Sequence, residues 1–358
     1  MNAAPSSSQA GPRSRRPASQ RAPRGRWAPS PTGLLHIGNA RTALAAWLSV
    51  RQRGGAFVWR VEDIDAPRTV AGMAEAAVED LAWLGLDWDE DPARGGPYAP
   101  YAQSQRSLVY EAALRVLAKR GRLFPCRLSR RDLIDMASAP HAEDEHQAGE
   151  EEPPYPAHAR PADLEPGWYD RLSSGEAALR FAVDAGVVRF VDRLYGAIDE
   201  RVDRSVGDFV LKRRDGLYAY QLAAVVDDWT MEIDEVVRGA DLLGSTARQI
   251  QLLEALGARR PVYAHVPLVV GAGGEKLSKR DASITLRSLR EQGAAPWQVV
   301  GYLAWSLGIV DRPMAATARE LVSEFSWSRI APGEWRLPGD LLARLRELRR
   351  SSRQPGRG

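Results

Sequence analysis

Residues 36–39 read His-Ile-Gly-Asn and combine two polar side chains with a glycine. Apolar residues follow with helical spacing, among them Leu44 and Leu48, so we predict a helix that begins close to His36. The first turn of a helix has backbone N–H groups without intrahelical partners and the positive end of the helix dipole. This turn is therefore expected to bind a phosphate group, with His36 and Asn39 as additional hydrogen-bond donors.

A second stretch, residues 271–280, joins a glycine-rich segment to a cluster of cations. Its basic part reads Lys-Leu-Ser-Lys-Arg and contains Lys276 and Lys279. Such a loop can clamp an anion, and the alternative is a solvated basic loop without a ligand. For such a stretch taken alone, the solvated loop is the usual interpretation, and the anion clamp is what the resemblance described below implies.

A predicted strand, residues 57–61, follows the predicted helix and ends in the acidic loop 62–65. Strand, helix and strand in succession form a βαβ unit, which predicts a parallel, doubly wound sheet of the α/β class. Ligands of such sheets bind at the carboxyl ends of the strands, and Glu62 stands at that end. A carboxylate is therefore expected at the substrate site, although acidic loops without a ligand also follow strands.

Four motifs together resemble the class I aminoacyl-tRNA synthetases. Residues 26–39, RWAPSPTGLLHIGN, are similar to the HIGH signature region, and residues 276–280, KLSKR, to the KMSKS loop. RVEDIDAPR at 60–68 and YQLAAVVDD at 220–228 resemble further motifs of the glutamyl-type members. The resemblance covers roughly residues 26–338.

The resemblance implies an α/β fold: a class I synthetase Rossmann-type parallel sheet, an inserted acceptor-binding-like subdomain and a short helical stem-contact region. We expect six segments along the chain. They are a disordered basic tail (1–24), the first half of the nucleotide-binding fold (25–121), the inserted subdomain (122–207), the second half of the nucleotide-binding fold (208–270), the KMSKS-like loop with the helical stem region (271–338) and a basic C-terminal tail (339–358).

The resemblance also implies a reaction, in which a glutamate carboxylate attacks the α-phosphate of ATP to give glutamyl adenylate and pyrophosphate. His36 and Lys279 are the implied catalytic residues, and Mg²⁺ is expected to accompany ATP through its phosphates. Residues implied in ATP binding are His36, Gly38, Asn39, Lys276 and Lys279. Residues implied in glutamate binding are Arg26, Trp27, Ala28, Pro29, Ser30, Glu62, Tyr220 and Arg238.

Opposite charges divide the glutamate-binding residues by role. Glu62 suits an α-ammonium group, and a fixed arginine suits a carboxylate through paired hydrogen bonds. Which arginine, Arg26 or Arg238, holds which carboxylate is left open. For Arg238 the alternative is a structural role, in which it pairs with Asp241.

Many relatives in this family bind zinc through C-x-C and Y-P-G-x-C-R motifs of the inserted subdomain. Here Cys126 and Tyr155 remain, whereas Leu128 and Ala159 stand where two cysteines are usual. Because zinc sites use about four donors, we expect a degenerate site without metal and no zinc cofactor. The alternative is that a histidine replaces a lost ligand, with His141, His146 and His158 as candidates.

The chain continues for 79 residues beyond Lys279 (358 − 279), and we expect no anticodon-binding body in them. The resemblance then favours the stand-alone catalytic paralogues among the glutamyl-type enzymes. They transfer activated glutamate to the queuosine base in the anticodon of tRNA(Asp), so the implied partners are L-glutamate and tRNA(Asp) bearing queuosine. Rival hypotheses are a truncated synthetase charging a tRNA 3′ end, a HIGH-type nucleotidyltransferase or ligase acting on a small carboxylate, and an inactive paralogue that binds RNA.

Composition narrows the class of protein further. A formal net charge of +3 and a pI near 9.1 weakly favour a polyanionic partner. No apolar run approaches the roughly 20 residues of a membrane span, so we expect no membrane partner. One cysteine, Cys126, excludes an internal disulfide and is typical of a reducing compartment. We therefore expect a cytoplasmic protein, and a monomer.

Local patterns predict the remaining elements. We expect a helix from about residue 70 capped by Thr69, helices at 105–120, 285–293 and 296–308, and a strand at 209–213 that opens the second half of the sheet. Residues 335–338 are expected to be the last recognisable structure. Relatives usually have a glycine about where Glu232 stands, so the segment 230–241 departs from the family pattern at its local turn.

Overall fold

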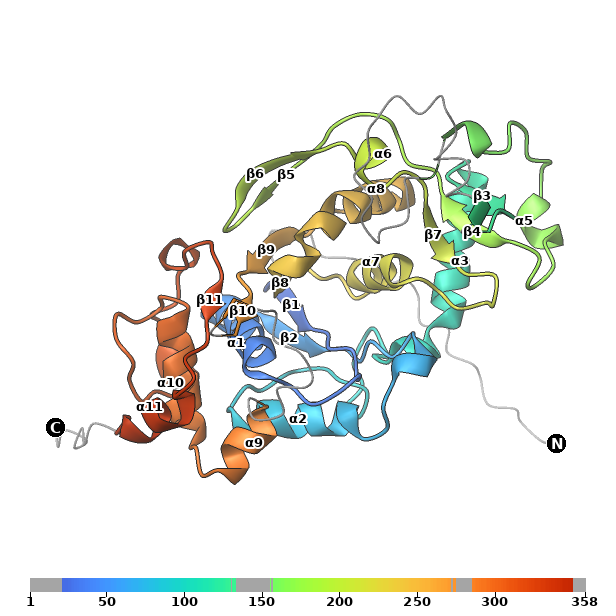
Figure 1. The fold of residues 1–358 in the computed structure, drawn as a ribbon. Helices are drawn as coiled ribbons and strands as arrows, with labels where there is room; N and C mark the ends of the chain where they lie inside the picture. Colours follow the sequence, from blue (N-terminus) through green and yellow to red (C-terminus); the bar gives the residue numbers. More distant parts are fainter. Residues whose placement is uncertain are drawn as a thin grey trace, which may run out of the picture.

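A six-stranded sheet crosses the middle of the molecule in the order β2-β1-β8-β9-β5-β6 (Figure 1). The computed structural model describes residues 21–129, 131–132, 155, 157–271, 273–274 and 285–349. Neighbouring strands are parallel, except for β5 and β6 at one edge. The predicted α/β class with a mostly parallel sheet is thus confirmed. The strands are β1 (Arg24–Trp27), β2 (Ala56–Trp59), β5 (Val188–Asp192), β6 (Gly196–Glu200), β8 (Glu235–Gly239) and β9 (Val262–Val266).

Alternation along each strand sends side chains to two cores, one on each face of the sheet. In β2, Phe57 and Trp59 enter one core and Val58 enters the other. Figure 1 shows α1 and α10 on one side of the sheet and α7 and α8 on the other, as expected of a doubly wound fold. The long helices are α1 (Ile37–Gln52), α2 (Met73–Trp83), α3 (Ser107–Lys119), α7 (Tyr220–Thr230), α8 (Thr246–Leu256) and α10 (Pro296–Ser306).

A separate three-stranded sheet corrects one expectation. The strand predicted at 209–213 forms as β7 (Phe209–Lys212), but it pairs with β4 (Ala178–Phe181), whose other neighbour is β3 (Leu123–Cys126). Conversely, β5 and β6 lie inside the segment expected to be an insertion, yet they join the central sheet. Alternation predicts where a strand forms and which face it buries, but it does not specify the partner strand.

Helix boundaries were predicted well except at α2. This helix begins at Met73 behind Gly72, which adopts φ 79°, so Thr69 is not its cap. Short helices complete the described ranges, and none of the helices there is long and apolar enough to span a membrane. They are η2 (Ala66–Arg68), η3 (Gln103–Gln105), η4 (Ala157–Ala159), α5 (Trp168–Arg171), α6 (Val202–Ser205), η5 (Ala240–Ser245), α9 (Leu286–Glu291), η7 (Arg319–Leu321), η8 (Trp327–Arg329) and α11 (Leu341–Glu347).

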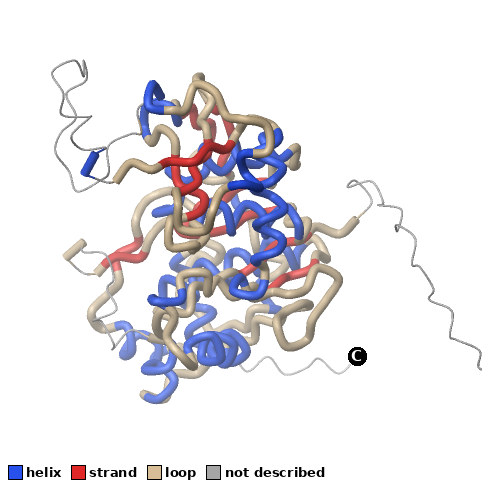
Figure 2. The backbone as a smooth tube through the Cα atoms, turned by 90° about the vertical axis from the view of Figure 1, so that its right-hand side faces the viewer, coloured by secondary structure: helices blue, strands red, loops and turns tan. Residues whose placement is uncertain are grey.

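Both ends of the described chain are more structured than expected. Arg24, placed in a disordered tail by the sequence analysis, begins β1 and makes a two-pronged ion pair with the buried Glu90. At the other end, α11 follows β11 (Trp335–Arg336), which pairs with β10 (Val269–Val270). Leu345 of α11 is completely buried, so residues 335–338 are not the last structure. Figure 1 shows α9, α10 and α11 together at one end of the molecule, and Figure 2 shows helices at the same end in the turned view.

The backbone at Glu232 has a left-handed conformation, which fits the glycine that relatives usually have at this position. Glu232 adopts φ 54°, the one positive value among the non-glycine residues that the structure describes. A side chain in this left-handed region costs roughly 1–2 kcal/mol. Tyr98 donates a hydrogen bond of 2.8 Å to its carboxylate, and Arg21 contacts both that carboxylate and its carbonyl oxygen. These contacts offset the strain.

Candidate active site

A cleft of about 660 Å³ opens at the carboxyl ends of β1, β2 and β8. Most of the predicted site residues line it together. Pro29 is an exception, because it faces a separate small hollow beside Trp59 and Met73. Lys276 and Lys279 lie outside the described residues. The predicted residues on the cleft wall are Arg26, Trp27, Ala28, Ser30, His36, Gly38, Asn39, Glu62, Tyr220 and Arg238.

His36 caps helix α1 with its own side chain. Its Nδ1 accepts hydrogen bonds from the backbone N–H groups of Gly38 (3.1 Å) and Asn39 (3.3 Å). In return, the Asn39 side-chain oxygen accepts from the His36 backbone N–H at 3.0 Å. The expectation that these N–H groups are free for a phosphate is therefore wrong for this structure. A reciprocal capping box thus provides internal partners for these two N–H groups of the first turn.

This capping fixes the form of the imidazole. Because Nδ1 accepts two hydrogen bonds, the ring proton of neutral His36 must lie on Nε2. Burial lowers the pKa of His36, while Asp241 acts in the opposite direction, so the ring is neutral at pH 7. A neutral imidazole on the cleft wall therefore offers its Nε2–H as a donor to a ligand.

Arg26 is held in a compact ion-pair network on its side of the cleft. Its Nε lies 3.1 Å from Asp228, and its Nη1 donates to the carbonyl oxygen of Val237 at 3.0 Å. Asp228 also pairs with Arg60 at 2.6 Å, and Arg60 in turn pairs with Glu62 at 2.8 Å. The charge of Arg26 is thus already balanced by a carboxylate before any ligand binds.

Glu62 is a buried carboxylate on the cleft wall with an unusual balance of forces. Burial raises its pKa, and the nearby Arg60 acts in the opposite direction without cancelling that effect. A positively charged ligand group would therefore stabilise its ionised form. Burial raises the pKa of Tyr220 as well, with Glu62 adding to the effect, so this side chain is a neutral phenol. The pair offers a negative charge beside a hydroxyl group.

Arg238 differs from Arg26 in its partners. Its guanidinium donates to His265 Nε2 (3.0 Å), Gln249 Oε1 (2.7 Å) and Thr246 Oγ1 (2.9 Å), all neutral acceptors. It is 6% exposed and makes no ion pair with a carboxylate of the described residues. The expected alternative, a structural pair with Asp241, is not seen. Within the described part of the chain, Arg238 is a buried cation at the cleft whose charge has no direct counter-ion.

Sequence reasoning missed several groups that build the site. Asp227 is completely buried and accepts hydrogen bonds from Gln103 (2.9 Å), Arg106 (2.6 Å) and Tyr110 (3.0 Å). The signal was present, since two adjacent carboxylates inside an apolar helix must find partners if they are buried. Other residues on the cleft wall were not singled out as site residues, among them Asp65, Arg68, Arg213 and Tyr218.

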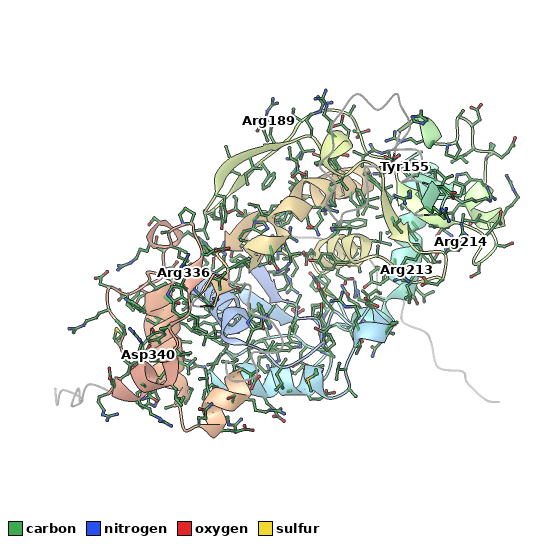
Figure 3. The ribbon with its side chains drawn as sticks, viewed as in Figure 1. Tyr155, Arg189, Arg213, Arg214, Arg336 and Asp340 are labelled. Atoms are coloured by element: carbon green, nitrogen blue, oxygen red, sulfur yellow. The ribbon has the colours of Figure 1, made fainter. Side chains whose placement is uncertain are left out.

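The candidate zinc region is an apolar cluster. Cys126 and Tyr155 pack with Phe124, and Leu128 and Ala159, which replace the usual cysteines, pack against the same group. Figure 3 shows Tyr155 in the part of the molecule that carries β3, β4 and β7, apart from the central sheet. Among the described residues, no group of three or more His, Cys, Asp or Glu side chains could hold a metal ion.

Comparison with known proteins shows which family this chain resembles. The family model of class I tRNA synthetases (E and Q), catalytic domain, matches residues 23–330. A glutamyl-Q tRNA(Asp) synthetase of Symbiobacterium thermophilum is 45% identical over 90% of this chain and 98% of its own. That of Nitratidesulfovibrio vulgaris is 42% identical, with the same coverage of each chain.

A solved structure agrees with these relatives. A glutamate tRNA ligase from Elizabethkingia meningosepticum, in complex with its amino acid, superposes with a TM-score of 0.78 at 28% identity, over 91% of this chain and 69% of that chain. The match to the family model runs from β1 through the cleft residues to η8. The chain therefore belongs to the catalytic-domain family of class I tRNA synthetases of the glutamyl and glutaminyl type.

Proposed function

We propose that this protein activates L-glutamate with ATP and transfers it to the queuosine base in the anticodon of tRNA(Asp). The observation that carries the proposal is the charge pattern of the cleft. Arg238 is a buried cation without a direct counter-ion among the described residues, and Glu62 is a buried carboxylate whose ionised form a cation would stabilise. An amino acid with an extra carboxylate supplies the complementary charges.

Each end of glutamate has a proposed partner. Glu62 binds the α-ammonium group, with the Tyr220 hydroxyl beside it. Arg238 binds a carboxylate with its remaining N–H groups, because Arg26 is already paired with Asp228. Trp27, Ala28 and Ser30 line the same cleft.

In the proposed first step, an oxygen of the glutamate α-carboxylate attacks the α-phosphorus of ATP. The bond to the bridging oxygen breaks, and pyrophosphate leaves with the electron pair. The protein aligns the reactants and stabilises charge on the phosphates. His36 donates its Nε2–H to a phosphate oxygen, and Gly38 and Asn39 form the adjoining wall. Lys276 and Lys279 are proposed to contact the departing pyrophosphate.

Magnesium is proposed to enter bound to the phosphates of ATP. The described residues do not fit a metal cage of their own, since no cluster of three or more ligating side chains occurs among them. No step of the mechanism is therefore assigned to a metal held by the protein.

The transfer step rests on the relatives, because two chains with this substrate in their names share over 40% of residues with this one. Queuosine-bearing tRNA(Asp) is the proposed acceptor, and a monomer in the cytoplasm is the proposed working form. The rival function is glutamylation of a tRNA 3′ end, and the similarity to a glutamate tRNA ligase supports this alternative.

A charging assay with labelled glutamate separates these functions. We expect label on tRNA(Asp) that carries queuosine and none on the same tRNA without it. Removal of the 3′-terminal adenosine is the matched control, because it abolishes 3′ charging but leaves queuosine intact. Label that requires the terminal adenosine and ignores queuosine would identify the rival. Glutamate-dependent pyrophosphate exchange together with no label on any tRNA would identify a small-molecule ligase.

The adenylate step has its own test. Lys279→Ala is expected to lower glutamate-dependent ATP–pyrophosphate exchange by about 10²-fold or more, the scale of one transition-state charge contact. The KM for glutamate should hardly change, because Lys279 is proposed to face phosphate. Near-normal exchange in this variant would remove Lys279 from the mechanism.

A further inference from the structure

Arg238 is the first of three buried side chains, on three adjacent strands, that are linked by hydrogen bonds. Arg238 of β8 donates its Nε–H to Nε2 of His265 in β9 at 3.0 Å. Nδ1 of His265 lies 2.7 Å from Oδ2 of Asp192, at the end of β5. His265 is 0% exposed and Asp192 is 1% exposed, so water does not reach either group. Neither residue lines the cleft, and the adenylate mechanism above uses neither.

The chemistry of the donors fixes where the imidazole proton lies. A guanidinium N–H can only donate, so Nε2 of His265 must accept and cannot carry a proton. The proton therefore lies on Nδ1 and is donated to Asp192. The hydroxyl of Thr246, 3.3 Å from Nε2, adds a second donor to the same nitrogen. Burial lowers the pKa of His265, which keeps this ring neutral.

Asp192 is itself held in one orientation. Its Oδ1 accepts hydrogen bonds from the backbone N–H groups of Leu194 (2.9 Å) and Tyr195 (3.0 Å), which leaves Oδ2 for His265. Burial acts to raise the pKa of Asp192, but the hydrogen bonds from His265 and the two backbone groups outweigh it and lower the pKa. The carboxylate is thus ionised, and the neutral imidazole ring of His265 separates its negative charge from Arg238.

Arg238 has donors left over in this arrangement. A guanidinium has five N–H donors, and His265, Gln249 and Thr246 take three of them. Two remain (5 − 3), one on each terminal nitrogen, on a side chain that lines the cleft. A carboxylate placed directly on Arg238, as Asp228 is on Arg26, would compete with the substrate for these donors.

We propose that Asp192 and His265 are positioning residues that orient Arg238 for the carboxylate of glutamate while leaving its charge available to the substrate. The proposal rests on the proposed function, because it assigns the substrate carboxylate to Arg238. The relay sets the direction of the guanidinium through a hydrogen bond rather than through an ion pair. Glutamate binding should therefore depend on which nitrogen of His265 carries the proton.

Asp192→Asn tests the relay with almost no change in shape. The two backbone N–H groups keep the amide oxygen at the Oδ1 position, so the NH₂ group must face His265. The amide then donates to Nδ1, so the ring proton moves to Nε2. The Nε2–H group of His265 and the Nε–H group of Arg238 then face each other as two donors and cannot form a hydrogen bond. We expect the KM for glutamate in pyrophosphate exchange to rise at least about 10-fold, the usual scale for removing an orienting partner. The KM for ATP should stay within about twofold.

A pair of His265 variants divides the relay into its two halves. The oxygen of Gln reaches the place of Nε2, so His265→Gln keeps an acceptor for Arg238 and loses the donor to Asp192. The shorter His265→Asn keeps the donor to Asp192 and loses the acceptor. We expect His265→Gln to retain the lower KM for glutamate of the two. Asp199→Asn is the control, because Asp199 is an exposed carboxylate on the neighbouring strand β6 and should leave both KM values unchanged.

Nitrogen NMR of His265 reads the tautomer directly and needs no substrate. We expect the Nδ1–H form in the wild type and the Nε2–H form in Asp192→Asn. An Nε2–H form in the wild type would overturn the relay, even if the variants failed to fold. So would an unchanged KM for glutamate in a folded Asp192→Asn protein, or an equal rise in both KM values. A wild type without glutamate-dependent exchange would instead refute the proposed function, whatever the tautomer.

Discussion

Two arginines from neighbouring strands reach the same cleft, but they are held in different ways. Arg26 of β1 contacts Asp228, which is shared with Arg60, so its charge is balanced inside the protein. Arg238 of β8 contacts three neutral side chains, and the nearest negative partner in its hydrogen-bond chain, Asp192, is one imidazole away. A balanced pair stabilises the wall of the cleft, whereas an unbalanced cation is available to a substrate.

The largest expected effect follows from removing the unbalanced cation. Arg238→Gln is expected to lower kcat/KM for glutamate by roughly 10⁴-fold, the scale at which sites built on polar partners discriminate. For the same reason the wild type should reject glutamine, and aspartate should be too short to reach the clamp. The measurement is amino-acid-dependent pyrophosphate exchange with all three substrates. A variant that still prefers glutamate as strongly as the wild type would make Arg238 structural and move the selectivity to Arg26.

Removing the balancing carboxylate should act on stability instead. Asp228→Ala leaves Arg26 and Arg60 buried with one carboxylate fewer, which is expected to cost about 3–5 kcal/mol in the free energy of unfolding. Urea unfolding measures this cost. Arg238→Gln is the matched control. Its cost in the free energy of unfolding should be clearly smaller, because it removes a buried charge rather than leaving one buried without a partner. Equal costs in the two variants would contradict the contrast between the two arginines.

Acid should reveal the same carboxylate in the wild type. Burial acts to raise the pKa of Asp228, but Arg26 and Arg60 outweigh burial and hold it below the ordinary value of 3.8. A pKa lower in the folded state means stabilisation that is complete above 3.8 and is lost as pH falls through the folded value. The wild type should therefore lose stability in that range. The Asp228→Ala protein should lack this component of its pH dependence.

At the nucleotide end, His36 combines a structural and a ligand-binding role that two variants can separate. Asn at position 36 can cap α1 but has no Nε2–H, so His36→Asn should lower pyrophosphate exchange by about 10²-fold. Its free energy of unfolding should stay within about 1 kcal/mol of the wild type. His36→Ala should lose the same activity and also roughly 0.5–2 kcal/mol of stability from the missing cap. Equal stability of both variants would refute the capping role.

The pH dependence of His36 has a definite sign. Burial lowers its pKa below the ordinary 6.5, so the folded state binds the proton less readily than the unfolded state. Its contribution to stability is therefore complete above pH 6.5 and declines as pH falls toward the folded pKa. His36→Asn should remove this decline, which a series of unfolding curves between pH 7 and pH 5 would show.

The smallest effect is expected far from both arginines, at the apolar cluster of Cys126 and Tyr155. Purified protein should contain well under one zinc per chain and keep its exchange activity after treatment with a chelator. Metal analysis and activity assays check this. Stoichiometric zinc that disappears with Cys126→Ala would mean that a histidine has replaced the lost ligands.

The sequence predicted those features that depend on local pattern. Helical spacing after His36 predicted α1, and the βαβ order predicted the parallel sheet and the position of Glu62 at its carboxyl edge. No local pattern could predict the contacts between residues that are far apart in the sequence. His265 and Asp192 are 73 residues apart, and each looks ordinary within its strand. The pairing of β7 with β4 was missed for the same reason, because alternation is indifferent to the choice of partner.

Glu232 has a consequence for how this chain tolerates mutation. At φ 54° the backbone accommodates glycine without strain and asparagine or aspartate at modest cost, whereas β-branched residues fit poorly. Glutamate persists there because Arg21 and Tyr98 hold its carboxylate. Substitutions usually regarded as drastic, such as glutamate to glycine, should therefore be among the mildest at this position, and valine among the harshest. The variation acceptable at residue 232 is governed by backbone geometry more than by charge or size.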